Sequence, residues 1–219
     1  MTDTDVVVEP TYRKRVGYQA GLLGGFATLA AALLAIGDVS THATIAQRQA
    51  EDVRASLSQV IPDHLHDNNL LQDTITLHHE GQPVLVYRAP QKGQVTAVAY
   101  PISGKGYSGE ISLMLGVSAK ADILGVRVLS HTETPGLGDK IEEKKDDWIF
   151  SFNGLSYTDS EDAHWGVKKD GGRFDQFSGA TITPRAVVKA VKQGLQFFHD
   201  HQQQLLEVSI KSDEKEADK

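Results

Sequence analysis

Residues 111–117 read Ile-Ser-Leu-Met-Leu-Gly-Val. Ile111, Leu113, Leu115 and Val117 stand at every second position of this stretch. Successive side chains of an extended chain point to opposite faces, so these four residues share one face. The stretch therefore predicts a β-strand with one buried face.

Short β-rich segments surround this strand in the sequence. We expect further strands at residues 84–87, 95–100 and 123–129, around 148–152 and around 165–168. Gly104, Gly106 and Gly109 predict a turn ahead of residues 111–117, and Gly125 is a candidate bulge position. Because turns separate most of these strands and helices lie at the two ends, we predict an α+β fold with a mostly antiparallel sheet.

Two amphipathic helices are expected to flank the sheet. The first, residues 41–61, ends at Pro62 and has an apolar face of Val53, Leu57, Val60 and Ile61. The second opens at Thr183 and Pro184, with Thr183 as the N-cap and Pro184 in the first helical position. Its apolar face comprises Val187, Val188, Val191, Leu195 and Phe198.

An apolar run near the N-terminus predicts a membrane anchor. Residues 16–36 carry no charge, and about 20 helical residues cross a hydrocarbon core of about 30 Å. The basic residues 13–15 precede the run and Asp38 follows it, so the positive-inside rule places the N-terminus in the cytoplasm. A cleaved signal peptide has similar parts, but the length of the run and the lack of a clear cleavage site before Asp38 favour an anchor.

Composition excludes several classes of function. The 219 residues carry a formal net charge of −7 and include no cysteine. A nucleic-acid partner is not expected because phosphate binding needs a basic face, and disulfides and thiolate-ligated clusters are excluded. The nine histidines are scattered and predict no metal site.

Two segments combine small and polar residues next to expected element ends. The first, residues 131–139, reads His-Thr-Glu-Thr-Pro-Gly-Leu-Gly-Asp; its Pro-Gly pair makes a tight turn, and Gly138 permits close approach of the backbone. In the second, residues 175–184, Thr181 precedes a helix N-terminus, where free N–H groups and the helix dipole favour a phosphate. Taken alone, either segment is also an ordinary loop or helix cap.

Together the two segments resemble the FMN-binding domain family. Residues 175–181, Asp-Gln-Phe-Ser-Gly-Ala-Thr, are similar to its flavinylation motif, Asp-x-x-Ser/Thr-Gly-Ala-Thr, and residues 131–142 are similar to its other signature. Residues 106–117 and the region of residues 148–152 fit the family as well. The resemblance runs from about residue 84 to residue 200, and within the family the pattern is most similar to the G subunits of Rnf (Rsx) complexes.

The resemblance implies a site for covalently attached FMN. In this family a flavin transferase joins FMN through a phosphodiester to the last threonine of the motif, which is Thr181 here. The rest of the motif that the transferase reads comprises Asp175, Ser178, Gly179 and Ala180. The flavin site is expected to be lined by Glu133, Thr134, Leu137, Gly138 and His131. Glu133 and Thr134 are expected to act on the flavin environment and not on the attachment.

The resemblance also implies an electron-transfer function. The subunit would accept an electron through its FMN and pass it on within a membrane complex that couples ferredoxin and NAD redox chemistry to ion movement. The implied partners are the other subunits, the membrane and the flavin transferase. Two alternatives stay open: the C subunit of the sodium-translocating NADH:quinone reductase, which shares both motifs, and an anchored binding module without redox chemistry.

The expected organisation has five segments. In order they are a cytoplasmic tail (1–15), a transmembrane helix (16–37), a helical linker region (38–82), a periplasmic FMN-binding domain (83–205) and a charged flexible tail (206–219). The chain would cross a bacterial inner membrane once.

Overall fold

The computed structural model describes residues 16–79, 81–157 and 164–207, without the side chains of residues 39–47, 49 and 50. The chain forms two compact units, Met1–Glu51 and Asp52–Lys219, and each is described by itself. The expected tail at residues 1–15, and all but two residues of the tail expected at 206–219, lie outside the described residues. The boundaries of the five expected segments stay predictions.

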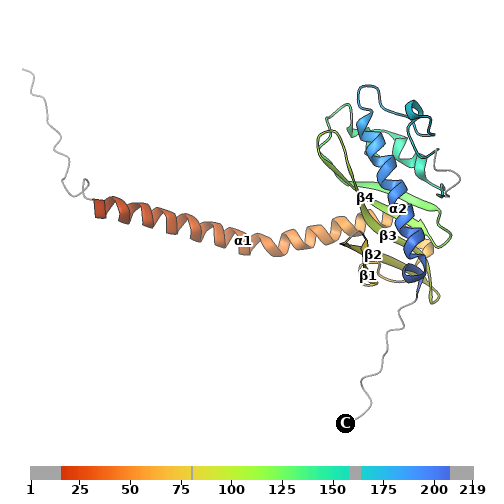
Figure 1. Ribbon diagram of the computed structural model, residues 1–219. Coiled ribbons are helices and arrows are strands. Elements are labelled where there is room, and N and C mark those ends of the chain that lie inside the picture. Colours follow the sequence, from red (N-terminus) through yellow and green to blue (C-terminus); the bar gives the residue numbers. More distant parts are fainter. Residues whose placement is uncertain (1–15, 80, 158–163, 208–219) are drawn as a thin grey trace, which may run out of the picture. The chain divides into compact units, whose positions relative to one another are not determined.

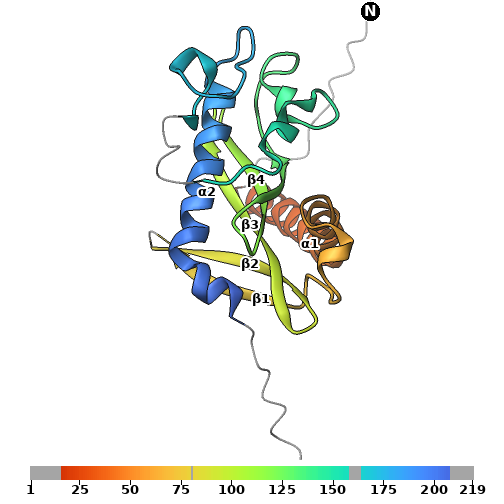
Figure 2. The ribbon, with the colours of Figure 1, turned by 90° about the vertical axis from the view of Figure 1, so that its right-hand side faces the viewer.

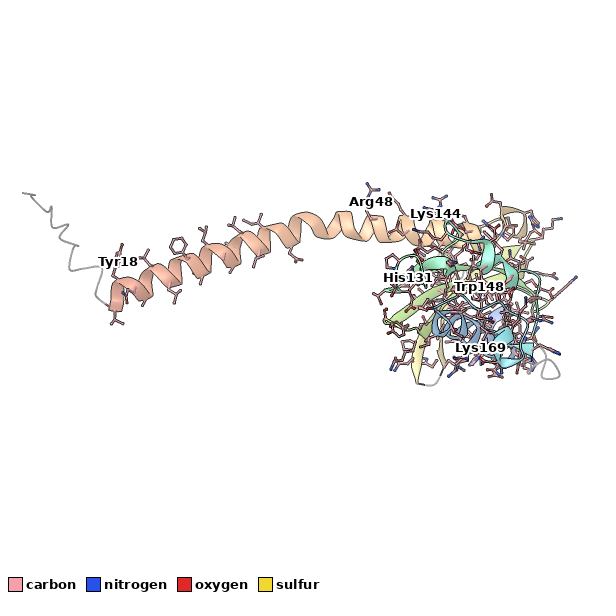
Figure 3. The ribbon with its side chains drawn as sticks, turned by 90° about the horizontal axis from the view of Figure 1, so that it is seen from above. Tyr18, Arg48, His131, Lys144, Trp148 and Lys169 are labelled. Carbon is pink, nitrogen blue, oxygen red and sulfur yellow. The ribbon has the colours of Figure 1, made fainter. Side chains whose placement is uncertain are left out.

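The first helix, α1, spans Val16–Val60 without a break (Figure 1). The sequence had predicted two helices here. No proline interrupts the join between them, and a single glycine such as Gly37 costs a helix only about 1 kcal/mol. Residues Val16–Asp38 have a mean hydropathy of 1.9 and are not buried, and Figure 3 shows side chains such as Tyr18 projecting from the helix. By length and composition this segment can cross a membrane, a test that a signal sequence also passes.

The second unit contains a five-stranded antiparallel sheet, which confirms the predicted α+β class. The strands follow one another in the order of the chain: β1 (Thr74–His79), β2 (Gln82–Gln91), β3 (Gln94–Lys105), β4 (Glu110–Ser118) and β5 (Ile123–Ser130). Strand β1 was not predicted, because its threonines and histidines gave no clear apolar face. Gly104 lies within β3 and not in the turn, where it pairs with Ile111.

The two faces of the sheet carry separate apolar clusters (Figure 2). Helix α2 (Ile182–Leu206) packs on the face that presents Val98 and Tyr100, and the Tyr100 hydroxyl donates to the carbonyl oxygen of Gly194 at 2.9 Å. The last turns of α1 pack on the other face, against small residues such as Ala97 and Ala99. The alternation that predicted β4 therefore divides the strand between two cores.

A glycine lets the end of α1 approach the sheet closely. A Cβ atom at Gly116 would lie 2.3 Å from the carbonyl oxygen of Val60, so no larger residue fits. The register between β4 and β5 shifts beside Gly116, where Gly116 pairs with Gly125 but Val117 pairs with Ile123. The irregularity therefore leaves Leu124 without a partner next to Gly125, the position expected for a bulge.

Two predicted strands are wrong. Residues Asp147–Phe152 form a 3₁₀ helix, η4, because Asp146 caps it by accepting from the Trp148 N–H at 3.0 Å. Around Val167 the structure has a single β-bridge to Phe174, followed by a short 3₁₀ helix, η6 (Lys168–Asp170). Both segments bury aromatic side chains in the core, and burial of this kind gives a strand-like composition to a turn.

The start of α2 also differs from the prediction. Thr181, and not Thr183, is the N-cap, so Pro184 occupies the third helical position. Proline is compatible with the first turn because the N–H groups there have no partner within the helix. Thr183 is consequently a helical residue, and its side chain is buried.

Candidate functional site

A pocket of about 590 Å³ lies at the N-terminal end of α2. Three segments that are distant in the sequence line it, namely the turn between β3 and β4, the loop after β5, and the start of α2 with the residues before it. The lining residues are Tyr107, Glu133, Thr134, Leu137, Gly138, Gly179, Ala180, Thr181, Ile182 and Thr183. A volume of this size is within the range of small-molecule sites.

The loop after β5, residues 131–139, is held by its own backbone. The N–H groups of Leu137 and Gly138 both donate to the carbonyl oxygen of Thr134, at 3.1 and 3.0 Å. Gly136 adopts a φ of 78°, the left-handed region that favours glycine. This turn places Leu137 and Gly138 at the pocket and leads into the 3₁₀ helix η3 (Asp139–Ile141), so the short helix expected near Asp139 is confirmed.

The acidic side chains of this loop are buried and bonded. Glu133 accepts from the Ser108 N–H at 2.9 Å and from the Thr183 hydroxyl. Asp139 is buried, and the backbone N–H of Gly136, helped by Lys145 at 3.6 Å, holds the pKa of that carboxyl below its usual range.

The segment before α2, residues 175–181, is anchored by aromatic side chains. The Trp148 indole N–H donates to the carbonyl oxygen of Asp175 at 2.8 Å, and the rings of Trp148 and Phe177 lie 5.1 Å apart. Figure 3 labels Trp148 among the packed side chains of this unit. The Ala180 N–H donates to the Phe177 carbonyl oxygen at 3.2 Å and closes a tight turn. Gly179, third in that turn, has a φ of 81°, which a residue with a Cβ adopts only with strain.

Thr181 lies where this turn meets the helix. It is half-buried, lines the pocket, and its hydroxyl makes no capping bond. The first N–H groups of a helix have no intrahelical partner and carry the positive end of its dipole. The Thr181 hydroxyl therefore stands beside donors suited to a phosphate.

Seven of the ten residues named from the sequence line this one pocket. They are Glu133, Thr134, Leu137, Gly138, Gly179, Ala180 and Thr181. The other three lie outside the lining. Asp175 and Ser178 are exposed, and His131 lies behind the loop, where its Nε2 is 2.9 Å from Glu142 Oε1.

Three lining residues were missed. Thr183 had been read as a cap, and Tyr107 and Ile182 carried no motif. Tyr107, Leu137 and Ile182 are exposed by 73%, 43% and 45%, respectively, and make an apolar rim around the pocket. The signal available in the sequence was an aromatic residue between glycines, at residues 106–109.

No second site carries comparable chemistry in the described part of the chain. A larger hollow of about 650 Å³ lies along the C-terminal half of α2, but neither motif contributes to it. Among the described residues, no group of three or more His, Asp and Glu side chains could hold a metal ion.

Known proteins resemble this chain over most of its length. A family profile described as the FMN-binding domain matches residues 106–196, which include both loops of the pocket. The G subunit of the ion-translocating oxidoreductase complex of Cereibacter sphaeroides is 53% identical over 186 residues, covering 84% of this chain and 85% of that protein. The corresponding G subunit of Shewanella piezotolerans is 46% identical over 191 residues, covering 84% and 90%. Among solved structures, NqrC of Shewanella oneidensis is 25% identical, covers 66% of this chain and 73% of its own, and has a TM-score of 0.47.

Proposed function

This chain belongs to the family of G subunits of ion-translocating oxidoreductase complexes, and on that premise we propose that it is an electron-transfer subunit carrying FMN on Thr181. The observation that carries the proposal is the pocket at the start of α2. There the last residue of the flavinylation motif lies in the same lining as residues of the second signature. Two segments about 40 residues apart thus contribute to one site.

The residues of the pocket fit the parts of FMN. Its phosphate needs donors, which the N–H groups of the first turn of α2 supply next to the Thr181 hydroxyl. Its isoalloxazine ring is flat and largely apolar, and the rim of Tyr107, Leu137 and Ile182 offers apolar surface of that kind. Apolar side chains left in water around a pocket are typical of a ligand site.

Attachment requires Thr181 to act as the acceptor. Its Oγ would bond to the flavin phosphorus and lose its proton, giving a phosphodiester. FMN by itself has no good leaving group, so the donor must be a flavin nucleotide activated as a phosphoanhydride, which releases the other nucleotide. A flavin transferase would catalyse this step, and the exposed motif residues Asp175 and Ser178 are accessible to it.

Bound FMN would supply the one-electron chemistry, and the protein's residues fix its position and exclude water from one side. A covalent bond also prevents loss of the cofactor. Even a micromolar site, worth about 8 kcal/mol, releases FMN into a compartment that contains little of it. Other subunits of an ion-translocating complex would deliver and receive the electrons, as the names of the relatives indicate.

We place the second unit on the periplasmic side of a bacterial inner membrane. Support comes from the basic residues 13–15 ahead of the apolar segment Val16–Asp38. Protease added to spheroplasts should digest residues beyond the span. Protection of this part in spheroplasts, with digestion only after lysis, would reverse the orientation.

Mass spectrometry tests the attachment. The full chain, produced with and without a flavin transferase, is digested, and the peptide containing Thr181 is weighed. Added mass of one FMN less one water, only with the transferase, supports the proposal. An unmodified peptide under both conditions would favour an anchored binding module, and copurification of the remaining subunits would separate a G subunit from a C subunit.

A further inference from the structure

We propose that Glu133 is a positioning residue that holds the first turn of α2, and therefore Thr181, in place for flavin attachment. This inference rests on the proposed function. It differs from the expectation that Glu133 acts on the flavin environment alone, because the carboxylate bonds to protein groups on two other segments. Its place is inside the pocket lining, where it is 4% exposed.

Each carboxylate oxygen of Glu133 joins a different segment to the loop. Oε1 accepts from the backbone N–H of Ser108, in the turn between β3 and β4, at 2.9 Å. Oε2 accepts from the hydroxyl of Thr183, in the first turn of α2. Thr183 is 1% exposed, so water cannot readily replace this bond. One side chain thereby connects all three segments that line the pocket.

The backbone that carries Glu133 is itself fixed. Its N–H donates to Nδ1 of His131 at 3.0 Å, and Nε2 of that ring lies 2.9 Å from Glu142 Oε1. This pattern assigns the ring proton to Nε2, because Nδ1 accepts. A carboxylate on a backbone held in this way has a defined position from which to orient other groups.

Glycines enclose the carboxylate. A Cβ atom at Gly106 would lie 2.4 Å from Glu133 Oε1, and one at Gly138 would lie 3.0 Å from Oε2. The space around Glu133 thus admits no larger residue at these positions without displacement. The second signature of the family supplies both the carboxylate and, at Gly138, part of the space that it occupies.

The bond to Thr183 acts on Thr181 through the helix. Thr181 is the N-cap and Thr183 the second residue of the helix, so both belong to its first turn. The N–H groups of a first turn lack intrahelical partners, and helix ends fray. Loss of the hydroxyl-to-carboxylate bond would leave this turn, with the acceptor hydroxyl, less ordered, while the buried face of α2 keeps the fold.

The test compares the rate of flavin attachment in full-length variants in detergent. Unmodified protein is incubated with a flavin transferase and its flavin dinucleotide donor. Thr183→Val removes the hydroxyl at nearly constant volume, Thr183→Ser keeps it, and Glu133→Gln removes one acceptor oxygen. We expect attachment to slow about tenfold in Thr183→Val and Glu133→Gln, equivalent to about 1.4 kcal/mol of activation free energy, and to recover in Thr183→Ser.

Two readouts separate positioning from stability. Thermal unfolding identifies variants that merely fold less well, with Thr76→Val on β1 as a matched control at an exposed threonine. Visible circular dichroism of the attached flavin, recorded well below the unfolding temperature, reports ring orientation and should change in Thr183→Val but not in Thr183→Ser. Wild-type rates and spectra in Thr183→Val and Glu133→Gln would overturn the inference. If Thr181→Val still accepts flavin, the proposed function fails; if only Thr183→Val behaves as wild type, the inference alone fails.

Discussion

Loop 131–139 and segment 175–181 line the same pocket but use their polar side chains differently. In the loop, Glu133 and Asp139 are buried and accept hydrogen bonds from their own protein. In the segment, Asp175 and Ser178 point to solvent, while Trp148 and the Phe177 ring hold only its backbone and core side.

This difference separates building a site from presenting one. Buried, bonded side chains determine the shape of the pocket and are sensitive to small changes in volume. Exposed side chains on a fixed backbone contribute little to stability but are accessible to a second protein. We therefore expect substitutions in the loop to change folding or geometry, and substitutions in the segment to change modification.

The largest effect should come from Thr181→Val. Valine matches threonine in size but has no hydroxyl, so covalent FMN should be lost completely while the fold remains. Ultraviolet fluorescence of the denatured protein band measures attachment, and Thr181→Ser is the control that keeps an acceptor oxygen. A fluorescent Thr181→Val band would place the attachment elsewhere and remove the special status of the segment.

Gly138→Ala should destabilise the fold. The added Cβ would lie 2.9 Å from both Glu133 Cβ and Thr183 Oγ1, and overpacking of this kind costs about 1–3 kcal/mol. Gly136→Ala is the comparison, because nothing lies within 4 Å of its Cβ position and its φ of 78° alone costs about 1 kcal/mol. Urea unfolding of the full chain, followed by the fluorescence of Trp148 and Trp165, gives both values. Equal or reversed costs would show that the loop tolerates volume and is not tightly packed.

Asp175→Ala should slow flavin attachment with little change in stability. Asp175 pairs with Lys168 at 2.6 Å, but both side chains are more than half exposed, and exposed pairs contribute about 0–1 kcal/mol. Lys168→Ala removes the same ion pair and serves as the control. Slower attachment in Asp175→Ala alone indicates that the carboxylate is read by the transferase. An equal effect in both variants would assign it to the ion pair.

The smallest effect is a pH dependence at Asp139. Its pKa is lowered by the Gly136 N–H and Lys145, so its contribution to stability is present above the pKa of the unfolded carboxyl, about 3.9, and is lost as the pH falls through the lower folded value. Asp139→Asn should therefore be less stable than wild type at pH 7, and the two should converge below about pH 4. Urea midpoints measured between pH 3 and pH 7 test this. A difference that is constant with pH would mean that the charge is not involved.

Local patterns account for much of what was predicted correctly. The alternation at residues 111–117 identified a strand, and turn residues separated its neighbours, so the antiparallel α+β class followed from side-chain periodicity. Hydropathy alone identified the span at Val16–Asp38. The flavinylation motif and the second signature were visible as letters, before any geometry placed them in one pocket.

Patterns failed where the structure depends on residues far away in the chain. Residues 148–152 contain the apolar and aromatic letters of a strand, but the Asp146 cap and the packing of Trp148 against Phe177 make them a 3₁₀ helix. Tyr107 and Ile182 became part of the site only when α2 docked beside the turn between β3 and β4.

The sequence by itself determined that the chain has an apolar span, a mostly antiparallel sheet and a threonine in a flavinylation motif, because each depends on neighbouring residues. Tertiary structure decided what Thr183 and Glu133 do. A threonine near a helix start can cap the helix or bond elsewhere, and the choice depends on an acceptor 50 residues away. Folding brings that carboxylate to the start of α2 and buries it there, and a buried carboxylate requires hydrogen-bond donors that only the assembled pocket provides.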